Sequence, residues 1–284
     1  MGERRDLPAA RQAFASADEH WEQGEGGDPA GLLDGTRRLD LKASLLKVDG
    51  QPEQALALLE EALQGMDTDP ARGRLLLQKA VCKEIAGEYE ASIQALAEAE
   101  PLISGEPEPR LLFACSFNRS VIACHIDSYE EAARLLPRVE ALAAAADLGT
   151  GLAGTRLLWL QGRTWAGLER REEAIAALAE VRQYFLSKEI AYDYALVTVE
   201  LATLYLEQGQ TPLVKELAEE MLWIFKGQKV HKEALAALAL FRQAARAEEA
   251  KAEWTRRLVK YLYKAQHNPR LRFLSPQARL PRAR

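Results

Sequence analysis

The chain has 284 residues, of which 48% are apolar, enough to bury a sizeable core in one or two domains. Its mean hydropathy is −0.24, and no apolar run approaches the ~18–20 residues that a membrane span needs. The polar N-terminus lacks the layout of a secretory signal. Three cysteines, Cys82, Cys115 and Cys124, argue against a disulfide framework and predict a reducing, cytoplasmic location.

The net charge of −5 conceals an asymmetry between the body of the chain and its C-terminal end. Residues 1–253 carry 28 basic and 42 acidic side chains, whereas residues 254–284 carry nine basic side chains and no acidic one. We therefore expect an acidic body followed by a basic C-terminal segment.

Helix-forming residues dominate and β-branched residues are sparse, which predicts helices almost throughout. The first predicted helix runs from Leu7 to about Gln23 and is followed by a Gly-rich break at 24–29. We expect residues 1–35 to form an N-terminal capping segment for the elements that follow.

Five segments then share one pattern, in which a helix, a short break and a second helix follow one another. The breaks centre on positions 50, 87, 127, 169 and 209, which lie 37, 40, 42 and 40 residues apart. The pattern covers roughly residues 36–245, and a degenerate sixth pair of helices reaches about residue 266. Recurrence at such a period is typical of helical repeat arrays.

The breaks resemble the G-x-Y-x-x-A-I/L turn of tetratricopeptide repeats. Gly87-Glu88-Tyr89-Glu90-Ala91-Ser92-Ile93 is the fullest example, whereas the third and fourth breaks have Asp127 and Glu169 in place of glycine. Glycine at this point supplies the left-handed backbone that ends a helix. The period exceeds the ~34 residues of the standard repeat and is similar to long-period arrays in bacterial signalling proteins and transcriptional regulators.

This resemblance implies an all-α fold: a right-handed α-solenoid of five to six helical hairpins, with capping helices at both ends. The array would occupy residues 36–266, and residues 267–284 would form a basic, flexible tail. Small residues seven positions before each turn are expected where paired helices approach closely, at Ala43, Ala80, Ser120, Gly162 and Ala202. Tyr89 and Tyr129 are expected to pack across their hairpins.

No catalytic constellation is present in the sequence. The HExxH, CxxC, GxSxG and Walker patterns are absent, and the four histidines lie far apart. Cys124 and His125 are neighbours, but adjacent residues on a helix point about 100° apart and serve one site poorly. We therefore predict a buried cysteine beside a histidine that faces a groove, a protein that is not an enzyme, and no metal or cofactor.

In tetratricopeptide arrays the first helix of each hairpin lines a concave groove, and this resemblance implies which residues face it. We expect a partner-binding groove lined by Arg37, Asp40, Arg74, Gln78, Phe117, Asn118, Val121, His125, Arg156, Trp159, Arg163, Glu200 and Thr203.

The groove residues include four arginines, whose planar donor fork suits carboxylates, and aromatic residues that could anchor a ligand. One hypothesis is therefore a peptide or protein partner with acidic or C-terminal carboxylate character. The alternative is that the arginines pair with Asp40, Glu200 and other local acids. Trp165 is expected in the core, and Trp159 is the aromatic candidate for the groove, with burial as its alternative.

The helix predicted at about 250–266 has three interpretations. It could cap the solenoid with its cations against the acidic body, continue into a nucleic-acid-binding tail, or act as a membrane-surface or dimerisation element. The fold resemblance favours a protein-binding adapter or sensor. The alternative is a regulator linked to transcription, acting through a partner or the basic tail; a homodimer is left open.

Overall fold

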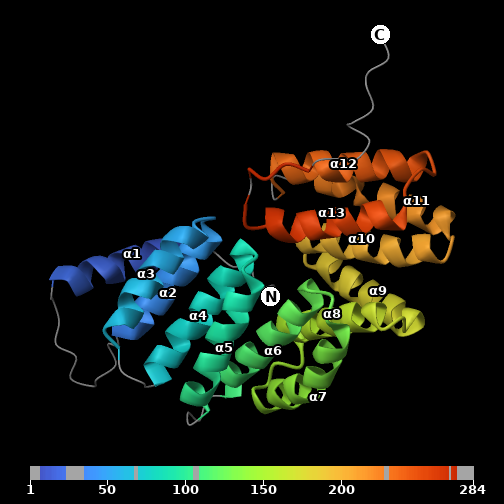
Figure 1. Cartoon of the computed structure of the whole chain (residues 1–284). Coiled ribbons are helices and arrows are strands. Elements are labelled where there is room, and N and C mark those ends of the chain that lie inside the picture. The colour runs from blue at the N-terminus through green and yellow to red at the C-terminus, as the bar shows by residue number, and fades with distance from the viewer. Residues whose placement is uncertain are drawn as a thin grey trace. The chain divides into compact units, whose positions relative to one another are not determined.

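The structure is a computed structural model that describes residues 7–23, 35–66, 70–104, 109–226, 230–268 and 270–273. Within these ranges it contains helices and turns and no strand, which confirms the expected all-helical fold (Figure 1). The helices are α1 Leu7–Gln23, α2 Gly35–Val48, α3 Pro52–Gln64, α4 Pro70–Ala86, α5 Tyr89–Ile103, α6 Pro109–His125, α7 Tyr129–Ala145, α8 Gly151–Gly167, α9 Arg171–Ser187, α10 Ala191–Glu207, α11 Thr211–Glu220, the 3₁₀-helix η1 Met221–Lys226, α12 Lys232–Arg246 and α13 Ala252–Ala265.

The predicted turns end helices with a left-handed residue at all five positions. The φ angles are 72° at Gly50, 80° at Gly87, 59° at Asp127, 60° at Glu169 and 72° at Gly209. In each turn the amide one residue further on donates to a carbonyl five residues back, as in a Schellman motif. The repeat turns are therefore confirmed, including the two that lack glycine.

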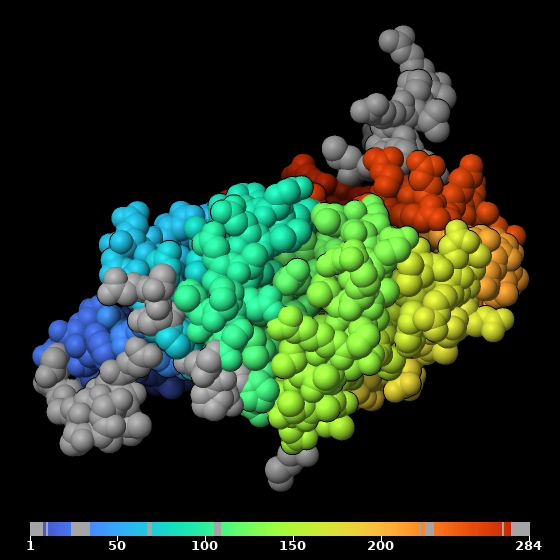
Figure 2. Space-filling view, turned by 60° about the horizontal axis from the view of Figure 1, so that its bottom comes forward, coloured from blue at the N-terminus to red at the C-terminus, as the bar shows by residue number. Residues whose placement is uncertain are grey.

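The chain divides into two compact units, residues 1–122 and 123–284, and the division falls within α6. In unit 1, α2 packs on α3, α3 on α4, and α4 on α5. In unit 2, α7 packs on α8, and each helix from α8 to α11 packs on the next one along the chain. Figure 2 shows the hairpins of unit 2 following one another in chain order across one face, from green through yellow to orange.

The small residues before each turn are buried, as the repeat pattern predicts. Ala43, Ala80, Ser120 and Ala202 are at most 1% exposed. A Cβ atom on Gly162 would lie 3.1 Å from Cδ2 of Leu178, so α8 and α9 already touch at their closest approach. These contacts explain why a bulky side chain is excluded at this repeat position.

The two turn tyrosines behave differently. Tyr89 packs on the apolar cluster that contains Ala80 and Leu96, as expected for packing across its hairpin. Tyr129 lies against Gly167 in α8, where an added Cβ would fall 2.0 Å from the ring. Tyr129 thereby contacts the next hairpin along the chain, because Gly167 leaves room for the ring, and its packing across its own hairpin stays a prediction.

Two features concern the ends of the described chain. The expected first helix is present as α1, where Arg38 of α2 contacts Asp18 and lies over the Trp21 ring. At the other end, α13 packs mainly along α10, as Figure 1 also shows, and less extensively on α12. No helix of the described ranges is both long enough and apolar enough to cross a membrane.

Candidate functional site

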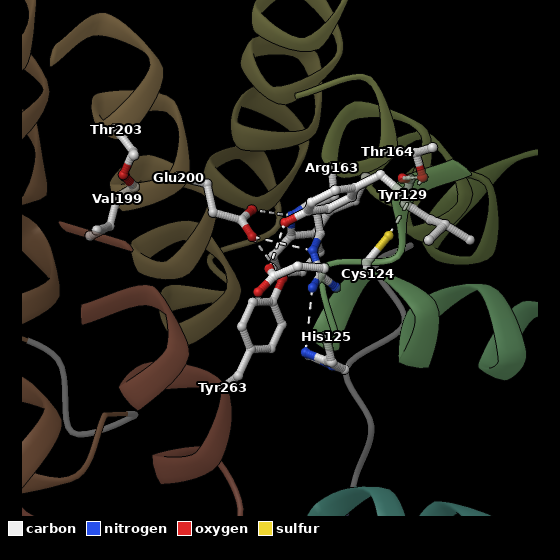
Figure 3. A network of polar contacts seen from close by, with 12 residues as sticks. Cys124, His125, Tyr129, Arg163, Thr164, Val199, Glu200, Thr203 and Tyr263 are labelled. Carbon is white, nitrogen blue, oxygen red and sulfur yellow. Dashed lines mark hydrogen bonds and ion pairs between the residues drawn. The ribbon is translucent and has the colours of Figure 1, made fainter. Parts of the chain in front are cut away.

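Unit 2 contains a cluster of polar and aromatic side chains, which we call the polar cluster. It consists of His125 at the end of α6, Trp159 and Arg163 on α8, Glu200 on α10 and Tyr263 on α13. Figure 3 shows four of them converging from separate helices: His125, Arg163, Glu200 and Tyr263. Trp159 and Arg163 lie four residues apart on one helix face, and therefore point to the same side.

Glu200 is the acceptor at the centre of the polar cluster. The indole N–H of Trp159 donates to Oε2 at 2.5 Å, and the hydroxyl of Tyr263 donates to Oε1 at 2.9 Å. Nε of Arg163 lies 3.5 Å from Oε1. One carboxylate thus connects α8, α10 and α13, and both of its oxygens are satisfied.

Arg163 is held between two rings. Its guanidinium carbon lies 4.5 Å from the centre of the Tyr263 ring, within the range of a cation–π contact. Its Nη2 lies 3.4 Å from Nδ1 of His125. Because a guanidinium can only donate, Nδ1 of His125 is the acceptor in this contact. His125 also meets the Tyr263 ring edge-on, with ring centres 4.9 Å apart.

Burial sets the protonation behaviour of the polar cluster. It raises the pKa of Glu200, against the opposing charge of Arg163 and the hydrogen bonds from Trp159 and Tyr263. It also raises the pKa of Tyr263 well above its ordinary value, so the phenol remains a hydrogen-bond donor at neutral pH.

Cys124 lies next to the polar cluster but is not an activated nucleophile. It is buried, its Sγ lies 3.5 Å from Oγ1 of Thr164, and burial raises the pKa of its thiol. A nucleophilic cysteine needs the opposite shift, toward the thiolate. Among the described residues, no group of three or more His, Cys, Asp or Glu side chains is arranged to hold a metal ion. The predicted burial of Cys124 is confirmed, whereas His125, which was expected to face a groove, is half-buried.

A hollow of about 550 Å³ opens beside the polar cluster. Arg163, Glu200 and Tyr263 contribute to its wall, and Asp127 and Glu169 lie at the two neighbouring turns. Charged side chains of α13 complete it: Glu253, Arg256, Arg257 and Lys260. Its size is within the range of ligand sites. Its wall carries both acidic and basic side chains, so it does not present a single sign of charge.

The sequence matches no protein-family model and no curated protein sequence. Among solved structures, a double mutant of MamA is similar over 70% of this chain and 98% of that chain, with 19% identity and a TM-score of 0.46. MamA from Desulfovibrio magneticus, from position 41 to its end, is similar over 70% of this chain and 99% of that chain, with 19% identity and a TM-score of 0.47. These values carry no inference about partners, and the repeat fold of this chain rests on its own turns and packing.

The structure brings most of the expected groove residues of unit 2 together. His125, Trp159, Arg163 and Glu200 all belong to the polar cluster. Thr203 is near them on α10, where it donates to Oγ1 of Thr255 on α13 at 2.8 Å. The remaining expected residue of this unit, Arg156, is exposed about two helical turns before the hollow-lining part of α8.

The expected groove residues of unit 1 form a separate set. Asp40 accepts from Arg37 at 2.8 Å and from Gln78, whose own oxygen accepts from Lys47. Burial lowers the pKa of Lys47. Phe117 packs on Phe113 with ring centres 5.4 Å apart. The other three, Arg74, Asn118 and Val121, are half-buried.

Two expectations about this face change. Trp159 is only 8% exposed and is therefore a buried hydrogen-bond donor, whereas Trp165 is half-buried with Arg170 over its ring. Arg37 and Arg163 are paired with Asp40 and Glu200, the alternative anticipated for them. Two of the four arginines that suggested an acidic partner are therefore already neutralised by acids of the same chain.

The sequence interpretation missed the part of the site that α13 supplies. Arg256 contacts Glu207 at 2.5 Å, and Lys260 contacts Asp127 at 2.9 Å. Together with Tyr263 they follow one helix face at a spacing of four and then three residues. The sequence shows this spacing, but it does not indicate which surface of the protein this helix face would contact.

Proposed function

We propose that the chain is a non-enzymatic interaction module that binds a segment of a partner protein on the face of unit 2 formed by α8, α10 and the end of α6. The observation that carries the proposal is that this face already binds a helix. Side chains from three separate elements, Asp127, Arg163 and Glu200, contact α13 through polar groups. A surface that orders one helix in this way can order another.

The chemistry of this face fits a binding role. Burial keeps the Cys124 thiol and the Tyr263 phenol protonated. Burial also raises the pKa of Glu200, but Trp159, Arg163 and Tyr263 engage both of its oxygens.

The alternative, a regulator acting through its basic tail, has less support in the described residues. Arg256 and Lys260 are engaged with acids of the same chain. Arg279, Arg282 and Arg284 lie outside the described residues, as does most of the tail predicted at 267–284. A cytoplasmic location remains a prediction from the sequence.

Site-directed photo-crosslinking tests the proposal. A photoreactive amino acid in place of Glu169, an exposed residue of the turn after α8 that lines the hollow, should capture a defined protein from native lysate. The matched control is the same amino acid in place of Ala141, which is exposed on α7 and does not line the hollow. Equal capture at both positions, or capture at neither, would show that this face is not the partner-binding surface.

A further inference from the structure

One face of α13 matches a row of acceptors on the body of unit 2. We call this the basic face. It carries two cations and a phenol at positions i, i+4 and i+7 of the helix, namely Arg256, Lys260 and Tyr263. Each meets a different acid: Glu207 at 2.5 Å, Asp127 at 2.9 Å and Glu200 at 2.9 Å, respectively. We call these three acids the acidic row. Two of them come from α10 and the third from the turn after α6.

The rest of α13 fixes its register on α10. Leu258 and Leu262 are at most 1% exposed and belong to the main apolar cluster of unit 2. Thr255 accepts from Thr203 at 2.8 Å. The surface therefore recognises an amphipathic helix through an apolar stripe and a flanking ladder of charge-assisted contacts, a recurring mode of helix recognition.

Two features make α13 suited to exchange. The side chains of Lys260 and Asp127 are 62% and 54% exposed, and exposed ion pairs contribute little individually. The connection from α12 is mostly exposed over residues 247–251. α13 packs less extensively on α12 than on α10, and Trp254 stacks on Phe241 of α12 with ring centres 6.3 Å apart. The helix is thus held by the surface beneath it more than by the hairpin that leads to it.

We propose that the acidic row is a recognition surface for a basic amphipathic helix of a partner protein, which carries two cations four residues apart and a tyrosine three residues further on. The internal helix α13 occupies the surface until such a helix displaces it. Charge complementarity argues for this occupant, since an acidic helix would place like charge beside Asp127 and Glu207, whereas Glu200 is already paired with Arg163. The inference rests on the proposed function and names the class of partner.

The test uses the full chain and a labelled peptide with the sequence of residues 251–268, followed by fluorescence anisotropy. Because α13 competes for the same surface, the Arg256→Glu/Lys260→Glu chain should bind the peptide about tenfold more tightly than the unaltered chain. The neutral Arg256→Gln/Lys260→Gln chain should show a smaller gain. This milder variant also preserves the test if charge reversal disturbs folding, which circular dichroism would reveal.

Charge reversal on both partners provides the specificity control. A peptide carrying Arg256→Glu/Lys260→Glu should fail to bind the unaltered chain and should bind a chain carrying Asp127→Lys/Glu207→Lys. The matched control chain carries Glu130→Lys/Glu172→Lys. These two residues are exposed on α7 and α9 and outside the hollow, so this chain should respond to the peptides like the unaltered one.

Three results would overturn the inference. Peptide binding that ignores charge would show that the acidic row does not select the helix. No binding even to the folded Arg256→Gln/Lys260→Gln chain would make α13 a fixed cap. A dimer that appears by light scattering as chain concentration rises, and that the Asp127→Lys/Glu207→Lys change abolishes, would make a second copy the occupant. Each of these results could accompany successful crosslinking at Glu169, which would leave the proposed function standing.

Discussion

The hydroxyl of Tyr263 donates to Glu200 at 2.9 Å, while the Tyr263 ring covers the guanidinium of Arg163, 4.5 Å from ring centre to guanidinium carbon. One side chain of α13 therefore contacts both members of a buried acid–base pair. The phenol acts as a donor to the acid and as a π surface to the base. Removal of α13 would therefore take away both the hydrogen bond to Glu200 and the ring that covers Arg163.

The first prediction concerns the hydroxyl alone. Tyr263→Phe keeps the ring over Arg163 but removes one donor to Glu200, and hydrogen bonds to charged groups contribute roughly 1.5–3 kcal/mol. We expect the free energy of unfolding, measured with urea, to fall by about 1–2 kcal/mol. Tyr205→Phe is the control, because its side chain is half-buried on α10 and it lies outside the polar cluster; it should change stability by less than about 0.5 kcal/mol. Equal effects of the two changes would contradict the assigned role of Tyr263.

The second prediction concerns the contact between Tyr129 and Gly167. A Cβ on Gly167 would fall 2.0 Å from the ring, so Gly167→Ala must displace Tyr129 and should cost about 1–3 kcal/mol of stability. In a Tyr129→Ala background the same change meets no ring, and the higher helix propensity of alanine should make it neutral or stabilising by up to about 1 kcal/mol. A double-mutant cycle measures the difference, and additive effects would mean that the ring does not occupy this position.

Local sequence chemistry could predict the turns, because each depends on a few consecutive residues. It also found the small residues at the helix contacts, such as Ala43 and Gly162. It missed the left-handed residues Asp147, Glu189 and Glu248, which end α7, α9 and α12. These are acidic rather than glycine, so no residue of unusual backbone freedom marks them, although the same six-residue hydrogen-bonding pattern is present.

The candidate site could be predicted only in part. The sequence predicts one shared face for His125, Trp159, Arg163 and Glu200 because each lies on the groove-facing side of the first helix of its hairpin, as counted back from the turn. Their mutual pairing depends on side-chain geometry between helices, which periodicity does not specify. The contribution of α13 depends on even longer separations, since Lys260 and Asp127 are 133 residues apart. A repeat pattern carries no information about a helix that folds back outside the pattern.

The third prediction concerns backbone strain at Glu248, where φ is 58°. A residue with a Cβ pays roughly 1–2 kcal/mol in the left-handed region, whereas glycine does not, although glycine loses more entropy on folding. We expect Glu248→Gly to be more stable than Glu248→Ala by about 1 kcal/mol in urea unfolding. The alanine variant is the matched control because it removes the same side chain but keeps the strain. A more stable alanine variant would rule out a left-handed residue at this position.

The last prediction concerns the pH dependence of the Asp127–Lys260 contact. Burial opposes the charge of Asp127, but hydrogen bonds from Lys260 and Tyr129 outweigh it and lower the pKa of Asp127 below its ordinary value of 3.8. A depressed carboxyl pKa contributes stability that is present above the unfolded pKa and is lost as the pH falls through the folded one.

The comparison that isolates this contact is Lys260→Met, which removes the cation and keeps an extended apolar side chain. The unaltered chain should exceed the variant in unfolding free energy by about 0.2–1 kcal/mol at pH 5–7, the range for an exposed ion pair. The difference should shrink below about pH 4, as Asp127 becomes protonated in both states. A difference that stays constant down to pH 2 would mean that Lys260 stabilises α13 by packing alone, and that Asp127 does not hold the helix through charge.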